Sequence, residues 1–323
     1  MNNLMLLNFP KLRAGLYPLY RIYMRMIGVP LHLPYHKQGQ EASDLIRDAL
    51  LAPDPCMVCR FGSLELQVMV AHLNRAGANG IVKKIQCVFR GEPLDYNLVL
   101  KNRFHYMAGF FPAEDVFMER FAQLMIEDSK QIDIVGVWRA EQHRIAKFFP
   151  QAGNVPFEAL EPYKYNPPWS QALEGKKVLV VHPFAETVKS QYGRREKLFE
   201  DKNVLPDFEL QTLKAVQSAA GKKVEYANWF EALDYMCDEI DRLDFDIALI
   251  GAGAYGFPLA AHVKRTGKKA VHMGGVSQLL FGIKGSRWDN VDYYKNLYNE
   301  YWVRPSRGET PADLTKIEGG SYW

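Results

Sequence analysis

The amino-acid sequence predicts an α/β fold: a Rossmann-like, mostly parallel sheet with helices on both faces. Two observations carry this prediction. Short apolar runs alternate along the chain with segments whose apolar residues recur at helical spacing, and turn residues separate the two kinds of segment. Strands that alternate with helices are joined by crossover helices, which make neighbouring strands parallel. The chain has 323 residues, which is enough for one large domain or for two lobes.

The first elements form an N-terminal α/β lobe at residues 37–160, after an N-terminal arm at residues 1–36. Apolar residues at helical spacing predict a helix at Gln40–Leu51, and a Pro-Asp-Pro turn follows it. The remaining elements of this lobe are predicted in chain order: a strand at 56–61, a helix at 64–74 with Ser63 as its N-cap, a strand at 79–89, a helix at 117–128, a strand at 132–138 and a helix at 139–149.

The later elements form a C-terminal Rossmann-like lobe at residues 161–303. Three prolines within residues 161–175 predict a connection there, which we take as the boundary between the lobes. The elements of this lobe are predicted in chain order: a strand at 176–181, a helix from about residue 185, a helix at 209–220, a strand at 224–227, a helix at 229–243, a strand at 245–251, a helix at 257–266 and a strand at 270–273. Residues 304–323 form a polar tail.

The composition excludes several classes of protein. The 40 basic and 37 acidic residues leave a net charge of +3, so we expect no nucleic-acid partner. The four cysteines are too few for a disulfide scaffold. Cys56 and Cys59 stand inside an apolar run without a second pair, which favours buried strand cysteines over a zinc or redox site. No apolar stretch reaches the ~18 residues of a membrane span and no signal peptide opens the chain, so we expect a cytoplasmic protein.

The N-terminal arm has a composition of its own. Residues 14–27 are rich in Tyr, Leu and Met, and Arg21 and Arg25 share one helical face. One interpretation is an arm that packs on the body of the protein. The other is an interfacial helix that lies on an anionic membrane, which would place the protein at the inner face of the membrane.

The first candidate site is the turn after the strand at 56–61, where Arg60, Gly62, Ser63 and Glu65 stand. A helix N-terminus at the carboxyl end of a parallel strand offers free N–H groups and partial positive charge to a phosphate. Arg60 can add a bidentate contact to a diphosphate. Glu65 can bind a divalent cation or accept a sugar hydroxyl, or it can simply complement the helix dipole.

The second candidate site begins at His182, which follows the predicted strand at 176–181. A histidine at a strand tip can serve as a general base or donate to a phosphate. The basic segment that follows, residues 189–197, contains Ser190 and Arg194. We interpret this segment as a phosphate-binding cluster, with a solvated helix face as the alternative.

The third candidate site is a G-x-G-x-x-G motif formed by Gly251, Gly253 and Gly256, between a predicted strand and a predicted helix. This is the context of a dinucleotide fingerprint. The acidic residue that would hold a ribose is missing, because Gly274 and Gly275 follow the next strand, so NAD is disfavoured. We expect the glycines to bring a nucleotide or sugar phosphate close to the backbone, and helix packing is the alternative.

The run Arg60-Phe61-Gly62-Ser63-Leu64-Glu65 resembles the Arg-Phe-Gly-Asp-Gly-Glu signature of the GT-D-fold glycosyltransferases, bacterial enzymes that build glycans on proteins or surface polysaccharides. The strand–glycine–helix unit at 246–256 is similar to the family's C-terminal part. The resemblance implies that the signature's acidic residues bind a divalent cation, Mn or Mg, and the nucleotide-sugar donor. Here Glu65 matches the Glu, whereas Ser63 replaces the Asp and is a poorer ligand for a hard cation.

These motifs predict a glycosyltransferase that moves a sugar from a nucleotide-sugar donor to a glycan or glycolipid acceptor. Glu65 and His182 are the expected catalytic residues, and Glu65 is also the expected metal ligand. The residues expected to bind the donor are Arg60, Gly62, Ser63, Ser190, Arg194, Gly251, Gly253, Gly256, Gly274 and Gly275. The alternatives are a pyruvyl or phosphoryl transferase of glycan assembly and a non-catalytic nucleotide-binding assembly protein. An NAD-dependent oxidoreductase ranks last.

Overall fold

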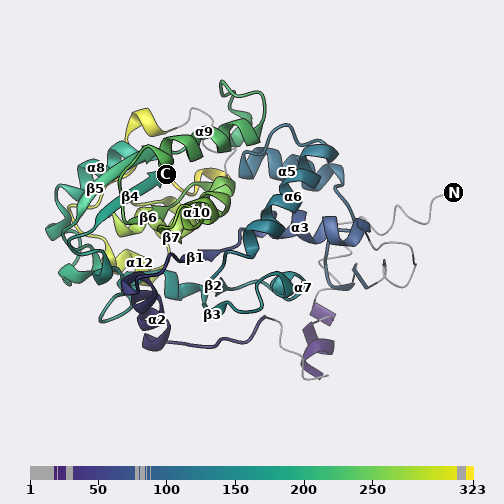
Figure 1. The fold of residues 1–323 in the computed structure, drawn as a ribbon, viewed down its shortest axis with the longest axis horizontal. Helices are drawn as coiled ribbons and strands as arrows, with labels where there is room; N and C mark the ends of the chain where they lie inside the picture. The colour runs from purple at the N-terminus through teal and green to yellow at the C-terminus, as the bar shows by residue number, and fades with distance from the viewer. Residues whose placement is uncertain are drawn as a thin grey trace.

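The fold is built on one parallel sheet of seven strands in the order β3-β2-β1-β7-β6-β4-β5, with helices on both faces (Figure 1). The computed structural model describes residues 18–19, 21–26, 32–76, 80, 84, 86–87, 89–310 and 318–323. All pairings between neighbouring strands are parallel. The predicted α/β class with a parallel, Rossmann-like sheet is therefore confirmed.

A strand from the C-terminal half completes the sheet beside the first strand of the N-terminal half. The strands are β1 (Met57–Arg60), β2 (Ile134–Val137), β3 (Gly153–Pro156), β4 (Lys177–His182), β5 (Glu209–Lys214), β6 (Ile247–Ile250) and β7 (Lys269–His272). Because β7 lies between β1 and β6, both halves of the chain share the sheet. The division into two lobes near residues 161–175 stays a prediction.

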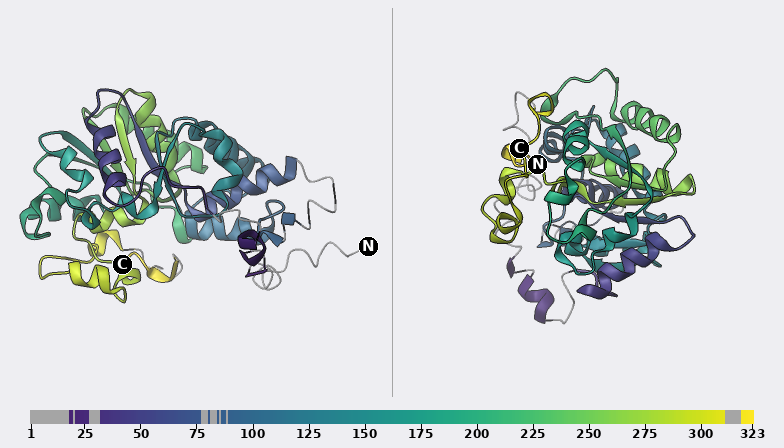
Figure 2. Two further views of the ribbon diagram at one scale, coloured as in Figure 1. Left: turned by 90° about the horizontal axis from the view of Figure 1, so that it is seen from below. Right: turned by 90° about the vertical axis from the view of Figure 1, so that its left-hand side faces the viewer.

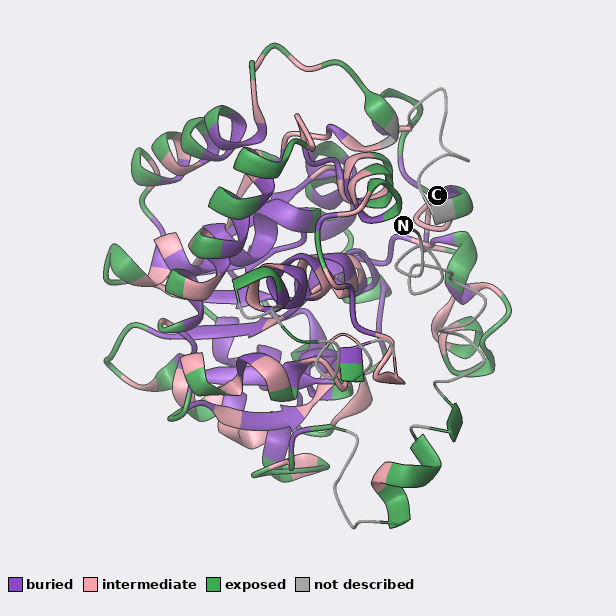
Figure 3. Ribbon diagram, turned by 90° about the vertical axis from the view of Figure 1, so that its right-hand side faces the viewer, coloured by how far each residue is buried: buried purple, intermediate pink, exposed green. Residues whose placement is uncertain are grey.

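The helices pack into two apolar cores, one on each face of the sheet (Figure 3). They are α2 (Gln40–Leu51), α3 (Ser63–Ala76), α5 (Leu98–Ala108), α6 (Asp115–Ser129), α7 (Gln142–Ile145), α8 (Ala185–Tyr192), α9 (Trp229–Asp241), α10 (Gly256–Arg265), α11 (Ser277–Leu280) and α12 (Asp292–Leu297). Met57 and Cys59 of β1 face the core that contains α3, α6, α9 and α10. Val58 faces the core of α2, α8 and α11, because successive strand residues point to opposite faces.

The C-x-x-C pair belongs to these cores. Cys56 and Cys59 are buried free thiols, and Cys59 lies within β1. Burial raises the pKa of the Cys56 thiol to about 11, so the thiol stays protonated at neutral pH. The prediction of buried cysteines is confirmed for both residues, and Cys59 lies in the strand whereas Cys56 directly precedes it.

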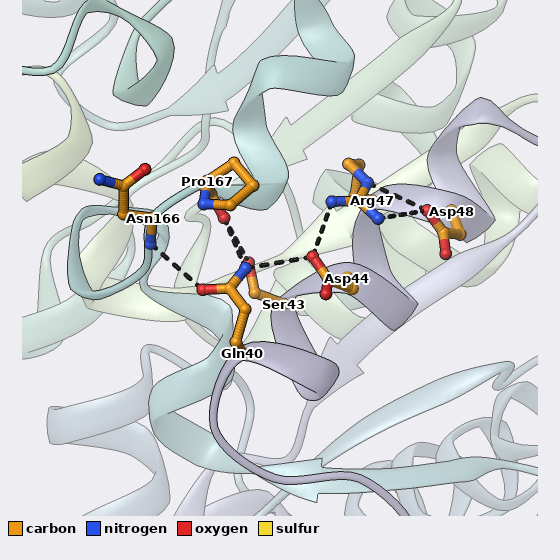
Figure 4. Close-up of polar contacts among 7 residues, drawn as sticks. All are labelled: Gln40, Ser43, Asp44, Arg47, Asp48, Asn166 and Pro167. Atoms are coloured by element: carbon orange, nitrogen blue, oxygen red, sulfur yellow. Dashed lines mark hydrogen bonds and ion pairs between the residues drawn. The ribbon is translucent and has the colours of Figure 1, made fainter.

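The start of α2 is tied to the proline-containing connection at residues 161–175. The Gln40 Nε2 donates to the Pro167 carbonyl over 2.8 Å, and the Gln40 Oε1 accepts from the Asn166 N–H over 3.2 Å (Figure 4). The same Nε2 also donates to the Asp44 carboxylate over 3.1 Å. This side chain therefore holds the connection against the first helix of the fold.

A short N-terminal helix stands apart from the sheet (Figure 2). Its described residues are 18–19 and 21–26, and residues 14–17, 20 and 27 of the predicted interfacial segment lie outside the described residues. Leu19, Ile22 and Met26 are 54%, 56% and 78% exposed. Within the part of the chain that the structure describes, no helix has the length and apolar character needed to cross a membrane.

The predicted helix at 209–220 is wrong. Glu209–Lys214 form β5, an edge strand that pairs with β4 along its whole length. Glu, Leu, Gln and Lys are good helix formers, but differences in helix propensity are small and pairing with a buried neighbouring strand outweighs them. The half-exposed side chains of β5 fit its place at the edge of the sheet.

Three shorter predictions also fail. Residues 224–227 form no strand, because the chain turns there toward Asn228, whose side chain caps α9. The described residues of the predicted strand at 79–89 that lie in regular structure, Lys84, Gln86, Cys87 and Phe89, are helical. The predicted helix at 139–149 is reduced to α7 and a 3-10 turn at Ala146–Phe148.

The boundaries of α3 correct a fourth expectation. Its first helical residue is Ser63, so this serine lies in the first turn rather than at the N-cap. The strand β3 and the helix α5 were not predicted from the sequence. The first is only four residues long, Gly153–Pro156, and its sequence lacks an apolar run.

Candidate functional site

A pocket of about 460 Å³ opens at the carboxyl ends of four neighbouring strands. Arg60, His272 and His182 end β1, β7 and β4, and Gly251 follows β6 directly. The strand order reverses at β1, because β2 and β3 lie on one side of it and the later strands lie on the other. Ligands of open α/β sheets bind in the crevice at such a point. The pocket is therefore the candidate functional site.

Arg60 places a positive charge against two neighbouring aromatic rings on the wall of this pocket. Its guanidinium carbon lies 5.1 Å from the centre of the Trp138 ring and 5.2 Å from that of Phe157. The backbone of Gly274 passes close by, since an added Cβ there would stand 3.1 Å from Nη1 of Arg60. These contacts hold the guanidinium at the strand end, where it can bind an anion with fork geometry.

The N-terminus of α3 faces the same pocket. Gly62, Ser63 and Glu65 all line it, so the first turn of the helix and its free N–H groups border the space. The Glu65 carboxylate folds back over Gly62, because an added Cβ on Gly62 would stand 1.9 Å from Oε2. The absence of a side chain at Gly62 is thus what allows the carboxylate its position.

His182 is a neutral hydrogen-bond donor. Its side chain is 3% exposed, and its Nδ1 accepts the Phe184 N–H over 2.9 Å. Burial lowers the pKa of the ring to about 4, against a smaller opposing effect of the Glu309 carboxylate. The proton therefore sits on Nε2, which has no hydrogen-bond partner among the described residues. A base with a pKa near 4 is poorly matched to neutral pH.

His272 lies on the neighbouring strand and is also neutral. Its Nδ1 is 3.3 Å from the Ile250 carbonyl oxygen, which makes Nδ1 the donor. Burial, with a further contribution from the Arg60 guanidinium, lowers the pKa of His272 to about 3. The sequence places His272 in the predicted strand at 270–273, just before the double glycine, but it is not among the expected catalytic or donor-binding residues.

The glycines of the G-x-G-x-x-G motif serve mainly for close packing. An added Cβ would stand 2.0 Å from the Ser277 Oγ at Gly251 and 2.3 Å from the His272 ring at Gly256. Gly253 differs, because it lines the pocket with a φ of 55° and nothing stands within 4 Å of its missing side chain. Of the three, Gly253 leaves open space for a ligand.

Two further predicted residues border the pocket, and three lie outside it. Gly274 and Gly275 line the pocket, whereas Gly256 is buried at the start of α10. Ser190 and Arg194 are exposed and do not line the pocket. Since a helix rises about 1.5 Å per residue, α8 carries both of them away from its start beside His182. The basic segment at 189–197 therefore does not complete the site.

The N-terminus of α8 already has an anionic partner. The Glu309 Oε1 accepts the Glu186 N–H over 2.9 Å and the Thr187 N–H over 3.3 Å. Burial raises the pKa of Glu309, but the hydrogen bonds from Thr187 and Ser306 outweigh it and the net direction is down. An ionised carboxylate thus takes the place that a phosphate was expected to take at this helix.

The aromatic side of the pocket was missed from the sequence. Trp138, Phe157, Tyr294, Tyr322 and Trp323 line it. The Trp138 ring is fixed by its Nε1, which donates to the Phe61 carbonyl over 3.0 Å. The segment with the last two rings is held by the Gln278 amide, which donates to the Tyr322 carbonyl over 3.0 Å. These rings come from four separate segments, so no local pattern joins them, although Trp138 follows a buried strand directly.

The donor set for a divalent cation is small. Glu65 is the carboxylate that lines the pocket in the described part of the chain, and Ser63 stands where the resembling family has an Asp. Among the described residues, no group of three or more His, Cys, Asp or Glu side chains could hold a metal ion. Mn and Mg take several oxygen ligands, so these side chains alone do not complete the coordination of a cation.

Comparisons with known proteins give one structural likeness. No protein-family model and no curated protein matches the chain. A solved structure titled "Selenomethionine substituted structure of domain of unknown function 1792 (DUF1792)" resembles it with a TM-score of 0.41 and 12% sequence identity. The likeness covers 83% of this chain and 96% of that chain. At this identity it assigns no residue and no activity to this protein.

Proposed function

We propose that this protein is a nucleotide-sugar-dependent glycosyltransferase that acts on a glycan or glycoconjugate acceptor in bacterial surface-polysaccharide or glycoprotein assembly. The observation that supports this most is the convergence of Arg60, the N-terminus of α3 and the Glu65 carboxylate in one pocket at the strand ends. The first two suit a diphosphate, and a carboxylate suits the hydroxyls of a sugar. The aromatic rings that line the same pocket suit a base or a sugar ring.

Each pocket residue has a role in this proposal. Arg60 and the first-turn N–H groups of α3 bind the donor diphosphate, with the Ser63 hydroxyl beside them. The neutral His182 donates from Nε2 to a donor or acceptor oxygen. During transfer, the bond between the anomeric carbon and the diphosphate oxygen breaks, a bond to the acceptor oxygen forms, and the acceptor proton must leave. Glu65 is the proposed base for that proton, because its carboxylate lines the pocket, whereas the unprotonated Nδ1 of the neutral His182 already accepts the Phe184 N–H.

The alternatives make different demands on the same pocket. An NAD-dependent oxidoreductase needs an acidic residue for the ribose after the strand that follows the glycine motif, and His272 ends that strand instead. A pyruvyl or phosphoryl transferase would use the same anion site but would leave a different product mass. A non-catalytic nucleotide-binding protein would bind the donor and turn nothing over.

A thermal-shift screen tests the proposed donor. The probes are UDP, GDP, dTDP, ADP, their common sugar conjugates and NAD. A ligand present at 100 times its Kd stabilises the folded state by about 2.7 kcal/mol, which corresponds to a rise in Tm of about 4 °C for a chain of this size. We expect such a rise with at least one nucleoside diphosphate and its sugar conjugate. Stabilisation by NAD alone, or by none of the probes, would overturn the proposal.

Replacing Gly62 by alanine is expected to abolish the contribution of Glu65 to nucleotide-sugar turnover while the protein stays folded. The added Cβ would stand 2.3 Å from the Glu65 carboxyl carbon, and the flexible end of this side chain can swing away at little energetic cost. We expect Gly62→Ala to lower nucleotide-sugar turnover as far as Glu65→Ala does, about tenfold or more. The double variant should fall no further, because both changes remove one interaction. A double variant whose loss of turnover combines the losses of the two single variants would contradict this coupling.

We also propose that the N-terminal helix contacts an anionic membrane surface. Leu19, Ile22 and Met26 recur at the spacing of one helical face and are each more than half exposed, while Arg21 and Arg25 lie on the other side. In co-sedimentation with phosphatidylglycerol-containing vesicles, Ile22→Asp/Met26→Asp should lower binding about tenfold. The control Val116→Asp changes an exposed apolar residue of α6 and should bind as wild type does. Wild-type protein that stays in the supernatant would refute the proposal.

A further inference from the structure

We propose that two arginines, Arg60 and Arg287, neutralise the bound diphosphate in place of a divalent cation. This inference rests on the proposed function, because it concerns the same donor site. Both side chains line the pocket, and each guanidinium lies over aromatic rings. The sequence places Arg287 in a charged and aromatic run at residues 284–289, downstream of the double glycine, but the expected donor-binding residues include only the first arginine.

Arg287 is held at the pocket by its backbone and by two rings. It lies in a 3-10 turn at Ser286–Trp288, and its N–H donates to the Ser321 carbonyl over 3.0 Å. Its guanidinium carbon lies 4.2 Å from the centre of the Tyr322 ring and 5.5 Å from that of Trp288. Stacking over these rings restricts a long side chain that would otherwise sample many rotamers.

The turn after β7 contacts both Arg60 and the Tyr322 ring on which Arg287 stacks. An added Cβ at Gly274 would stand 3.1 Å from the Arg60 Nη1, and one at the next residue, Gly275, would stand 2.3 Å from the Tyr322 ring. Arg60 and the ring beneath Arg287 therefore pack against consecutive residues. This is the use that the structure makes of the double glycine, which the sequence had suggested as a contact to the phosphate itself.

The charges in the pocket match a diphosphate. Among the described side chains that line it, the ionised ones are Arg60, Arg287 and Glu65, since His182 and His272 are neutral. The two guanidinium groups carry two positive charges, the Glu65 carboxylate removes one, and the N-terminus of α3 adds a partial positive charge of about 0.5. The pocket is therefore net positive by about 1.5 charges, which favours the doubly negative diphosphate of a nucleotide sugar. The side chains of the pocket offer a hard cation one carboxylate and one hydroxyl, Glu65 and Ser63, so the diphosphate and water would have to supply most of its ligands.

Isothermal titration calorimetry with UDP, GDP and dTDP tests this inference. Each nucleotide is titrated once in the presence of EDTA and once in excess Mn²⁺. We expect one of them to bind with a Kd that agrees between the two conditions within about threefold. Binding that requires Mn²⁺ would overturn the inference and leave the proposed function standing. Absence of binding in both conditions would overturn the proposed function as well, so the two failures are distinguishable.

Variants measured in EDTA test the second arginine itself. Arg287→Gln should weaken binding of the same nucleotide about tenfold, because an exposed charge-assisted contact is worth roughly a tenfold change in affinity. Arg287→Lys should recover part of the loss. The control Arg242→Gln removes an exposed arginine that does not line the pocket and whose partner is Glu239, and it should bind as wild type does. A wild-type Kd for a folded Arg287→Gln protein would overturn the inference.

Discussion

Replacing Arg60 by glutamine is expected to weaken binding of the nucleoside diphosphate by roughly 10- to 150-fold, with no loss of fold. A hydrogen bond to a charged group contributes about 1.5–3 kcal/mol, and each 1.4 kcal/mol is a tenfold change in affinity. The side chain ends β1 and its charged end lies against the Trp138 and Phe157 rings rather than in the apolar core. Glutamine keeps an aliphatic stem with a polar end there, so the sheet should form as before. Titration calorimetry of the variant measures the loss.

The matched control for this variant is Arg194→Gln. Arg194 belongs to the basic segment that the sequence suggested as a phosphate-binding cluster, but it is exposed and lies outside the pocket. We expect the control to bind nucleotide with the wild-type Kd. The Kd of Arg60→Lys should lie between those of Arg60→Gln and the control, because an ammonium keeps the charge but not the bidentate hydrogen bonds of a guanidinium. A tenfold loss in Arg194→Gln with none in Arg60→Gln would place the anion site at α8 and contradict the assignment.

Acidification from pH 7.5 to pH 5 is expected to lower the free energy of unfolding by about 4 kcal/mol through His182 and His272 alone. Their folded-state pKa values are about 4 and about 3, below the unfolded value of 6.5. The unfolded chain therefore binds protons near pH 6.5 that the native protein does not bind. The stability that these residues contribute is present above pH 6.5 and is lost as the pH falls toward the folded pKa values, by about 2 kcal/mol each at pH 5.

Urea unfolding at pH 7.5, 6 and 5 measures this dependence. The variant His182→Asn/His272→Asn places an amide near each Nδ1, where it can accept the Phe184 N–H or donate to the Ile250 carbonyl. The double variant should lose most of the difference in unfolding free energy between the two end pH values. The control His143→Asn changes an exposed histidine and should keep the wild-type difference. A double variant that keeps the full pH dependence would show that neither ring is held neutral in the fold.

Local patterns were enough to predict the core of the fold. The helix at Gln40–Leu51 is predicted with its observed boundaries, and β1, β4, β6 and β7 fall within a residue or two of their predicted positions. These strands are buried on both faces and read as continuous apolar runs, which is the clearest strand signal in a parallel sheet. The edge strands failed, because β5 is half exposed and β3 contains Gly, Asn and Pro. Their places are set by pairing with a neighbour rather than by local preference.

The candidate site was predictable where its residues follow strands directly. Arg60, Gly62, Ser63 and Glu65 fall together because they share one strand-to-helix turn. Ser190 and Arg194 do not reach the pocket. A sequence shows that a basic cluster follows a strand, but not how far the intervening helix carries the cluster from the strand end. The aromatic side of the pocket could not be predicted from the sequence, for another reason. Arg287 and Tyr322 meet across a connection distant from any strand, so only the folded chain shows that they line the same pocket.

The most direct test of the central claim is the mass of the products formed from nucleotide sugars. Purified protein is incubated with UDP-, GDP- and dTDP-sugars that carry ¹³C in the sugar, with water or a glycan as acceptor. The products are then separated and their masses are measured by mass spectrometry. The account predicts release of an unlabelled nucleoside diphosphate together with labelled sugar, free or on the acceptor, and loss of this release in Arg60→Gln. Intact donors under all conditions, or transfer of a phosphoryl or pyruvyl group instead of the labelled sugar, would contradict it.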